Sequence, residues 1–240
     1  SDADALKAKA TAGNIRSQLT ELGFDPKIFD DSLSEIETLL AAEDIINLAK
    51  LISKIYGCFC PEQYDNQLNI EAHRTITAKE IEQQLQENGD SLEGYRLMCA
   101  FGTGGTSGGL SKHMNEKYGK KAVHVVFPIP GQDVAGIRTK AKANGLRLYN
   151  PDAYQAEHEV DFGQAKHILK FFVEKGHNIG ESTALALYSV LEMVSDGDKG
   201  KFIVVVADGI EKYKKNLEAM FTEQRMQVSL DEAAASVSEY

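Results

Sequence analysis

The feature that most constrains the fold of this chain is the segment 102–109, in which five of eight residues are glycine. An apolar run at 95–101 precedes it, and apolar residues with helical spacing follow at 110–118. A strand that leads through a glycine-rich turn into a helix presents several backbone N–H groups in one direction, next to the positive end of the helix dipole. Glycine also permits positive φ and the close approach of a ligand. The segment therefore predicts an anion site of the kind that holds a phosphate.

In the rest of the second half, stretches with the apolar pattern of a strand alternate with stretches that have the apolar spacing of a helix. We expect strands at 95–101, 121–127, 158–160 and 202–206, a further short strand at 146–149, and helices at 77–87, 110–118, 135–143, 162–175, 184–194 and 210–221. Strands that alternate with helices and are joined by short loops form a parallel sheet covered on both faces. The expected fold class is α/β, a doubly wound and mostly parallel sheet whose ligands bind at the carboxyl ends of the strands.

The first quarter of the chain is expected to be mainly helical. Helices are predicted at 3–22 and 32–52, the second opened by a capping box at Ser32, with a strand or turn at 24–29. The stretch 56–60 is predicted to be a strand that places Cys58 and Cys60 on one face. Because neither a histidine pair nor a second cysteine pair completes a metal site, we interpret the cysteines as small buried apolar residues.

Charge and composition exclude some classes of function. The 240 residues carry a formal net charge of −10, which argues against nucleic acid or an anionic membrane as the main partner. There is no apolar run of membrane-spanning length and no signal-peptide pattern, so we expect a cytoplasmic location. The six histidines show no metal-ligand spacing, and no metal site is predicted.

Four motifs in order resemble a known family, the cysteine synthase group of pyridoxal-phosphate enzymes. Residues 62–66 (Glu-Gln-Tyr-Asp-Asn) and 69–74 (Asn-Ile-Glu-Ala-His-Arg) resemble its Gln-Gln-Phe-x-Asn-Pro-x-Asn-Pro-x-x-His segment. Residues 102–106 (Gly-Thr-Gly-Gly-Thr) match its phosphate cup, and 180–184 (Gly-Glu-Ser-Thr-Ala) stand where it has Gly-x-Ser-Ser-Gly. Residues 207–213 resemble its Pro-Ser/Asp-x-Gly-Glu-Arg-Tyr segment. The resemblance runs from about residue 15 to residue 217 and implies fold type II, the tryptophan-synthase β-like fold.

The resemblance also implies roles for individual residues. The phosphate of pyridoxal 5′-phosphate would be held by five of them, Gly102, Thr103, Gly104, Gly105 and Thr106. Asp208 would lie at or beside the position facing the pyridine nitrogen, where a carboxylate favours a protonated ring. Gln63 would lie near the substrate carboxylate. Arg138 resembles the arginine that binds the substrate phosphate in members that use O-phosphoserine, and a planar guanidinium suits that dianion.

The family's activity is the next implication. Such an enzyme eliminates phosphate or acetate from O-phosphoserine or O-acetylserine to give α-aminoacrylate, to which a sulfur donor then adds. Residues 61–240 would be the large phosphate-binding domain, residues 1–60 would be a remnant of the small domain, and the chain would form a homodimer. Both activated serines remain open as the substrate.

One part of the family pattern is not found. The family tethers its cofactor to a lysine about a hundred residues before the position of Gln63, in a Ser-x-Lys context. None of the lysines before Gln63 has that context, so we identify no catalytic residue and expect the Schiff-base lysine to be absent. The chain is then either part of a longer or split enzyme, or a non-catalytic relative that binds phosphate or cofactor in a regulatory role. A nucleotide-binding enzyme is a third hypothesis, disfavoured because no Walker lysine follows the glycines.

Simpler interpretations also stand beside the family roles. Arg138 could be a solvated surface arginine, and Asp208 could be the N-cap of a helix that begins near Ile210. Glu181 and Ser182 are expected to cap the helix that follows them rather than to take part in chemistry.

Overall fold

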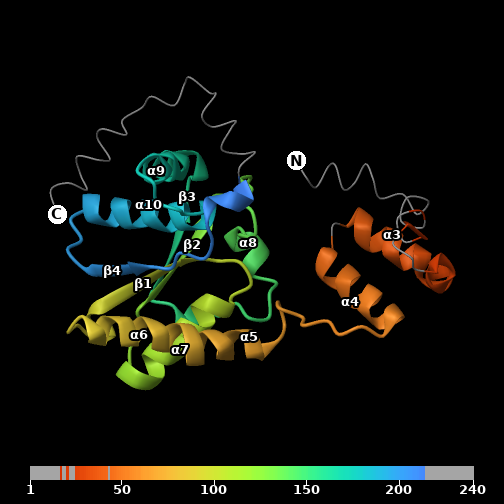
Figure 1. Cartoon of the computed structure of the whole chain (residues 1–240), viewed down its shortest axis with the longest axis horizontal. Coiled ribbons are helices and arrows are strands. Elements are labelled where there is room, and N and C mark those ends of the chain that lie inside the picture. Colours follow the sequence, from red (N-terminus) through yellow and green to blue (C-terminus); the bar gives the residue numbers. More distant parts are fainter. Residues whose placement is uncertain (1–16, 18–19, 22–24, 43, 214–240) are drawn as a thin grey trace. The chain divides into compact units, whose positions relative to one another are not determined.

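The computed structural model describes residues 17, 20–21, 25–42 and 44–213 (Figure 1). It divides the chain into two compact units, with the boundary between Glu62 and Gln63. The helix predicted at 3–22 lies largely outside the described residues, as do the tail and most of the helix predicted at 210–221. No described helix is long and apolar enough to cross a membrane.

The first unit contains short helices. Its described elements are η1 (Pro26–Ser32, a 3-10 helix), α3 (Leu33–Ala41) and α4 (Ile45–Tyr56). The single helix predicted at 32–52 is therefore wrong, because the side chain of Asp44 accepts a hydrogen bond from the N–H of Asn47 at 3.1 Å and starts a second helix. Ser32 makes no capping side-chain hydrogen bond, so the predicted capping box does not form.

The strand predicted at 56–60 is also wrong. The helical spacing of apolar residues in α4 continues to Tyr56, and Gly57 ends the helix in the left-handed conformation with φ 61°. The following N–H, that of Cys58, still bonds back to the carbonyl of Ser53 at 2.9 Å. Cys58 is exposed and Cys60 half-buried, contrary to the burial expected for both, whereas Cys99 is buried and its thiol pKa is raised by that burial to about 12.

The second unit is a parallel sheet between helices, as the sequence predicted. Its strands are β1 (Tyr95–Ala100), β2 (Val123–Pro128), β3 (Ala156–Val160) and β4 (Lys201–Val204), in the order β3-β2-β1-β4. Its helices are α5 (Gln67–Ala72), the π-helical η2 (His73–Thr77), α6 (Ala78–Glu87), η3 (Leu92–Gly94), α7 (Gly105–Tyr118), α8 (Lys140–Ala143), η4 (Pro151–Ala153), α9 (Phe162–Glu174), α10 (Glu181–Ser195) and η5 (Ile210–Tyr213). Every described strand pair is parallel.

Alternate residues of the central strands face two separate cores. On one face, Leu97 and Val125 pack with Leu110 of α7. On the other, Met98 and Val126 pack with Leu185 of α10. Figure 1 shows the same layers, with α5, α6 and α7 on one side of the sheet and α9 and α10 on the other. This arrangement confirms the doubly wound α/β class and explains why β2 is buried along its whole length.

Several boundaries differ from prediction because helices continue through residues that lack helical periodicity. The helix expected from 77 begins at Gln67, where the Asn66 side chain accepts the N–H of Leu68 at 3.0 Å, and runs through η2 into α6. α7 begins at Gly105, inside the glycine segment, and not at 110. The helix expected at 135–143 is reduced to α8, and turns replace the strand expected at 146–149.

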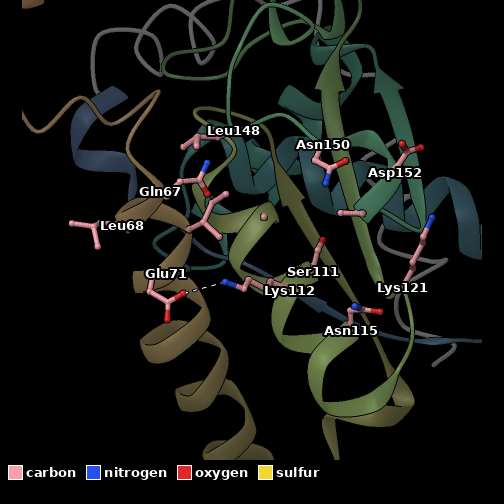
Figure 2. Close-up of a pocket in the computed structure, with 13 residues that line it drawn as sticks. Gln67, Leu68, Glu71, Ser111, Lys112, Asn115, Lys121, Leu148, Asn150 and Asp152 are labelled. Atoms are coloured by element: carbon pink, nitrogen blue, oxygen red, sulfur yellow. Dashed lines mark hydrogen bonds and ion pairs between the residues drawn. The ribbon is translucent and has the colours of Figure 1, made fainter.

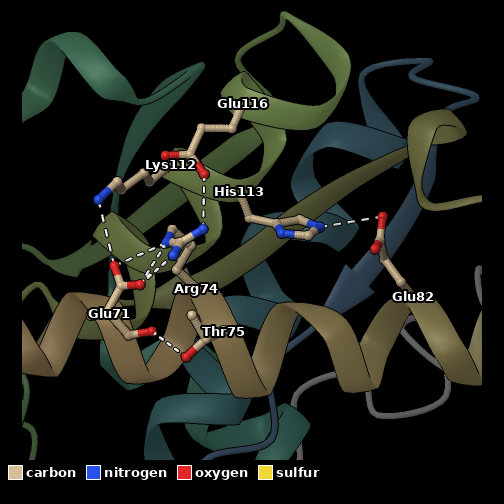
Figure 3. Close-up of polar contacts among 7 residues, drawn as sticks. All are labelled: Glu71, Arg74, Thr75, Glu82, Lys112, His113 and Glu116. Atoms are coloured by element: carbon tan, nitrogen blue, oxygen red, sulfur yellow. Dashed lines mark hydrogen bonds and ion pairs between the residues drawn. The ribbon is translucent and has the colours of Figure 1, made fainter.

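Polar contacts fasten the α5–η2–α6 helix to α7 (Figure 3). Arg74 of η2 pairs with Glu71 and reaches Glu116 of α7 at 3.0 Å. Further along, Glu82 of α6 is buried against α7, and its carboxylate lies 3.2 Å from Nε2 of His113. These contacts hold the helix that carries residues 69–74 against the helix that opens from the glycine segment.

Candidate functional site

The glycine segment forms the turn between β1 and α7. At the end of β1 the N–H of Phe101 still bonds to the carbonyl of Val126 at 3.0 Å, and Gly104 then takes φ 91° as the N-cap of α7. A Cβ on Gly104 would lie 2.8 Å from the carbonyl oxygen of Leu148. Both the left-handed backbone and this contact require glycine.

The turn places the start of a long helix at the carboxyl edge of the sheet. The first N–H groups of a helix have no acceptor inside it, and α7 is 14 residues long, so its N-terminus carries a full helix dipole. Gly104 and Gly105 are buried, while Thr103 and Thr106 are half-buried with hydroxyls near this edge. Backbone N–H groups, two hydroxyls and the dipole together suit a phosphate.

Asn69 of α5 supports the turn from outside. Its Nδ2 donates to Oγ1 of Thr103 at 3.0 Å and to the carbonyl of Gln63 at 2.8 Å. The same Thr103 oxygen accepts the N–H of Gly105 at 3.2 Å. A Cβ on Gly105 would lie 2.0 Å from Oδ1 of Asn69, so glycine is what lets this amide reach the turn.

His73 makes a second contact with the glycine segment. Its Nε2 lies 3.2 Å from Oγ1 of Thr106, and its Nδ1 lies 3.0 Å from Oγ1 of Thr77. Burial lowers the pKa of His73, which favours the neutral ring, with one nitrogen donating and the other accepting. No role was predicted for Asn69 or His73, although both stand in the motif at 69–74; the spacing of an amide and an imidazole one helical turn apart was the available signal.

Arg138 lies beside the turn. Its backbone N–H donates to the carbonyl of Phe101 at 2.8 Å. This bond holds the Arg138 backbone against the residue that precedes Gly102. Its Nη2 donates to the hydroxyl of Tyr64 at 2.8 Å, and the guanidinium carbon lies 5.2 Å from the centre of that ring. Arg138 is half-buried and held by Tyr64, which differs from a freely solvated side chain.

The other predicted residues are distributed around the same unit. The side chain of Gln63 is exposed, and its link to the turn is the carbonyl that Asn69 binds. Asp208 is half-buried in the loop after β4. In that loop the N–H of Ile210, near which Asp208 was a candidate N-cap, donates to Oδ1 of Asn178 at 2.8 Å.

The start of α10 carries two buried hydroxyls. Gly180 is its N-cap, so neither Glu181 nor Ser182 stands at the capping position predicted for them. Ser182 and Thr183 are 7% and 1% exposed, and neither hydroxyl has a hydrogen-bond partner among the described residues. Because α10 precedes the parallel strand β4, its N-terminus lies at the edge where the strands end. Within the described part of the chain, no group of three or more metal-binding side chains is found.

Comparison with known proteins identifies the family. Residues 10–209 match the profile of the pyridoxal-phosphate-dependent enzyme family. The chain belongs to this family. Its relatives include the probable cysteine synthase of Bacillus subtilis (strain 168), 28% identical over 173 residues, and the cysteine synthase of Staphylococcus aureus (strain N315), 26% identical over 174 residues. These alignments cover 68% and 69% of this chain and 55% of each relative, so the chain spans about half the length of the relatives it matches.

Solved structures of two enzymes share the fold. A mutant of O-ureido-L-serine synthase with O-ureido-L-serine bound aligns with a TM-score of 0.60 at 21% identity, over 82% of this chain and 62% of that one. A hydrogen sulfide-producing enzyme of Fusobacterium nucleatum aligns with a TM-score of 0.57 at 23% identity, over 70% and 61% of the two chains. The predicted relation to cysteine synthases and the predicted fold are confirmed.

The residues present fit the phosphate of the family's cofactor, pyridoxal 5′-phosphate. The turn places the hydroxyls of Thr103 and Thr106, which contact Asn69 and His73, at the N-terminus of α7, and hydroxyls beside the first N–H groups of a helix are donors that suit a phosphate. The hydroxyls of Ser182 and Thr183, which have no partner in the described part of the chain, supply further hydrogen-bonding capacity at a second helix start.

Proposed function

We propose that this chain forms the phosphate-binding part of a pyridoxal-phosphate-dependent enzyme that replaces the β-substituent of O-phosphoserine or O-acetylserine with sulfur. The observation that carries the proposal is the turn from β1 to α7, in which Asn69, Thr103 and Gly105 form one hydrogen-bonded group within a chain of this family. The cofactor, when bound, supplies the electron sink that β-replacement needs. The chain's own residues bind and orient it.

In this proposal the turn holds the cofactor's phosphate by its N–H groups and by the hydroxyls of Thr103 and Thr106. Asn69 and His73 keep those two hydroxyls in fixed positions, since Nδ2 of Asn69 donates to the hydroxyl of Thr103 and Nε2 of His73 lies within hydrogen-bonding distance of the hydroxyl of Thr106. A pre-oriented hydroxyl loses less entropy on binding an anion than a freely rotating one. Asp208 is proposed to favour a protonated pyridine nitrogen, and Gln63 to lie near the substrate carboxylate.

Arg138 is proposed to bind the phosphate of O-phosphoserine. The hydrogen bond from Nη2 to Tyr64 holds the guanidinium near the turn, and its remaining N–H groups can pair with a phosphate dianion. This arrangement favours O-phosphoserine over O-acetylserine. Titrating the chain with each compound tests it: Arg138→Ala should weaken O-phosphoserine binding at least tenfold and leave O-acetylserine unchanged. Equal losses for both compounds would contradict the assignment.

The tethering lysine is proposed to come from the half of the enzyme that this chain does not span. Residues 1–60 would then be what this chain holds of the small domain, and residues 61–240 would be the large domain. We further propose a cytoplasmic homodimer. Sedimentation would report the mass of two chains if the homodimer proposal is right and the mass of one chain if it is wrong.

Equilibrium dialysis with pyridoxal 5′-phosphate, followed by borohydride reduction and mass measurement, tests the main proposal. We expect reversible binding, competed by inorganic phosphate, and no covalent adduct on a single lysine of this chain. Thr106→Val should weaken binding at least fivefold, whereas Thr38→Val, at an exposed position of α3, should not. Absence of binding by folded protein would overturn the proposal, and a stoichiometric adduct would overturn the assignment of the lysine to the other half.

The alternative is a non-catalytic module that binds phosphate or cofactor in a regulatory role. The observation in its favour is that none of the lysines before Gln63 stands in the family's Ser-x-Lys context. Adding a chain that carries the relatives' remaining half decides between them. Appearance of β-replacement activity on mixing supports the enzyme, and cofactor binding without activity supports the module.

A further inference from the structure

The second half of the glycine segment brings the α5–η2 helix close to α7. A Cβ on Gly109 would lie 2.5 Å from Cβ of His73, so the two helices approach each other there without an intervening side chain. Figure 2 shows Glu71 of α5 pointing toward Lys112 of α7, and this ion pair, at 3.5 Å, joins the same two helices. The close approach lets the ring of His73 reach the first turn of α7.

The ring of His73 lies between two threonine hydroxyls. Its Nε2 is 3.2 Å from Oγ1 of Thr106, and its Nδ1 is 3.0 Å from Oγ1 of Thr77. A neutral imidazole has one donor nitrogen and one acceptor nitrogen, so the two hydrogen bonds run in one direction, either from Thr77 to Thr106 or back. The direction decides what the Thr106 hydroxyl can offer to a ligand.

The two directions leave Thr106 with different capacities. If Nδ1 of His73 carried the ring hydrogen, Nε2 would accept the hydroxyl hydrogen of Thr106, and only lone pairs would remain for a ligand. If Nε2 carries it, the ring donates to Oγ1 of Thr106, and the hydroxyl hydrogen is free for another acceptor. A phosphate dianion has acceptors only, so the second direction alone adds a donor for it.

The position of Thr77 favours this second direction. Thr75, in the same π turn, donates its hydroxyl hydrogen to the carbonyl of Glu71, four residues back, at 2.8 Å (Figure 3). For Thr77 the corresponding carbonyl is that of His73, which already accepts the N–H of Ala78. Among the described residues, the bond to His73 is the only hydrogen bond found for the Thr77 hydroxyl. Its hydrogen is therefore paired only if it is donated to Nδ1.

Thr103, the other threonine of the turn, presents a donor by a different route. Its Oγ1 accepts Nδ2 of Asn69 at 3.0 Å and the N–H of Gly105 at 3.2 Å. Both lone pairs of the oxygen are then in use, and the hydroxyl hydrogen remains to be donated. The donor at Thr103 is thus independent of His73, whereas the donor at Thr106 depends on the tautomer of the ring.

We propose that Thr77 holds His73 in its Nε2–H tautomer, and that the ring thereby turns the hydroxyl hydrogen of Thr106 toward the cofactor's phosphate. His73 and Thr77 are then positioning residues that act through Thr106. Burial lowers the pKa of His73, which favours the neutral ring at pH 7. The tautomer is a property of the chain without ligand, and the use of the Thr106 hydrogen rests on the proposed function.

Nitrogen-15 NMR of the full chain, labelled in its histidine rings, measures the tautomer, because protonated and unprotonated ring nitrogens resonate far apart. The His73 signals are those that His73→Gln lacks. At pH 7 we expect Nε2 to be protonated and Nδ1 unprotonated. Thr77→Val should raise the protonated fraction of Nδ1, and Thr77→Ser, which keeps a hydroxyl, should not. The matched control is Thr75→Val, which removes a hydroxyl that bonds to Glu71 in the same turn and should leave the tautomer unchanged.

Equilibrium dialysis of the same variants with pyridoxal 5′-phosphate relates the tautomer to the ligand. If the Nε2–H form is the one that binds, affinity falls in proportion to its fraction, so a variant with about half of that form should bind about twofold more weakly. By reciprocity, adding pyridoxal 5′-phosphate to Thr77→Val should return Nδ1 of His73 to the unprotonated state. Thr75→Val and Thr77→Ser should bind as the unchanged protein does.

The outcomes separate this proposal from the proposed function. A protonated Nδ1 in the unchanged protein, or a tautomer that Thr77→Val leaves as it was, would overturn the proposal even if the cofactor binds. A cofactor affinity that stays constant while the tautomer changes would overturn the role of Thr106. Absence of cofactor binding by a chain with the expected tautomer would contradict the proposed function and that role, while supporting the direction set by Thr77.

Discussion

Nδ2 of Asn69 donates to Oγ1 of Thr103 at 3.0 Å, across 34 residues of sequence. The bond joins α5 to the turn between β1 and α7, and it is possible only because Gly105 has no side chain where the amide lies. Because Thr103 also accepts the N–H of Gly105, the three residues act as one group. The effects of substituting them on the free energy of unfolding should therefore be non-additive.

The first prediction concerns this coupling. Gly105→Ala displaces the Asn69 side chain and breaks its hydrogen bonds, so it should lower the free energy of unfolding by about 1–2 kcal/mol. Asn69→Ala should cost a similar amount, and the double variant should cost about the same as either single one. Urea unfolding of the four proteins measures the coupling. Additive losses would show that the amide does not fill the space at Gly105.

The second prediction concerns Gly109, further along α7. A Cβ there would lie 2.6 Å from the carbonyl oxygen of Ile70 and 2.8 Å from the N–H nitrogen of Arg74, and backbone atoms cannot move aside cheaply. Gly109→Ala should lower the free energy of unfolding by about 3 kcal/mol by forcing apart α7 and the α5–η2 helix. Gly145→Ala, where nothing lies within 4 Å, is the matched control and should change it by less than about 1 kcal/mol. Similar losses for both would contradict the close packing.

The third prediction concerns Glu82. Burial alone would raise the pKa of this carboxyl, but hydrogen bonds from Lys117, Tyr118 and His113 outweigh it and lower the pKa. Glu82→Gln should cost about 2 kcal/mol at pH 7, the order expected for hydrogen bonds to a charged group. The exposed Glu80→Gln on the same helix should cost little.

The pH dependence gives a second test of Glu82. A carboxyl with a pKa lower in the folded than in the unfolded protein stabilises the fold above the unfolded pKa, and this is lost as pH falls through the folded one. The difference in stability between the native protein and Glu82→Gln should therefore be constant above pH 5 and shrink below about pH 4.5. A difference that grows in acid would contradict the assignment.

The fourth prediction concerns the histidine pair between β2 and β3. Nδ1 of His124 lies 2.8 Å from Nε2 of His158, with the rings stacked 5.1 Å apart. Burial, then the charge of His158 and that of Arg96, lowers the pKa of His124 to about 4, although Gln155 and Asp198 act in the opposite direction. His124 is therefore neutral in the fold at pH 7.

As pH falls, protonation of this histidine pair should begin to lower the stability of the fold at a higher pH than protonation of the carboxylates does. Because the folded pKa lies below the unfolded value of about 6.5, stability is complete above pH 6.5 and falls between there and pH 4. The loss from pH 7 to pH 5 should be about 2 kcal/mol, and His124→Gln should remove most of that slope. The exposed His177→Gln should retain it. An unchanged slope in His124→Gln would contradict the buried neutral pair.

Sequence patterns predicted the elements in which apolar residues recur at the regular spacing of a strand or a helix. β1, β2 and β3 and helices α9 and α10 lie close to their predicted ranges, because a strand or helix inside a covered sheet repeats its apolar residues regularly. The same reasoning failed at 56–60, where the β-like alternation of Cys58 and Cys60 was outweighed by the helix that ends at Gly57. It also missed α5, whose short polar sequence is helical because Asn66 caps it and α7 covers it.

By itself, the sequence determined the glycine turn, the α/β alternation and the family, since these depend on residues near one another in the chain and on motifs in a fixed order. Only the tertiary structure decided what surrounds the turn. Asn69 and His73 reach Thr103 and Thr106, and Arg138 reaches Tyr64. These contacts join residues 33 to 74 positions apart, and no local pattern encodes them. The packing of separate elements against one another brings these residues together.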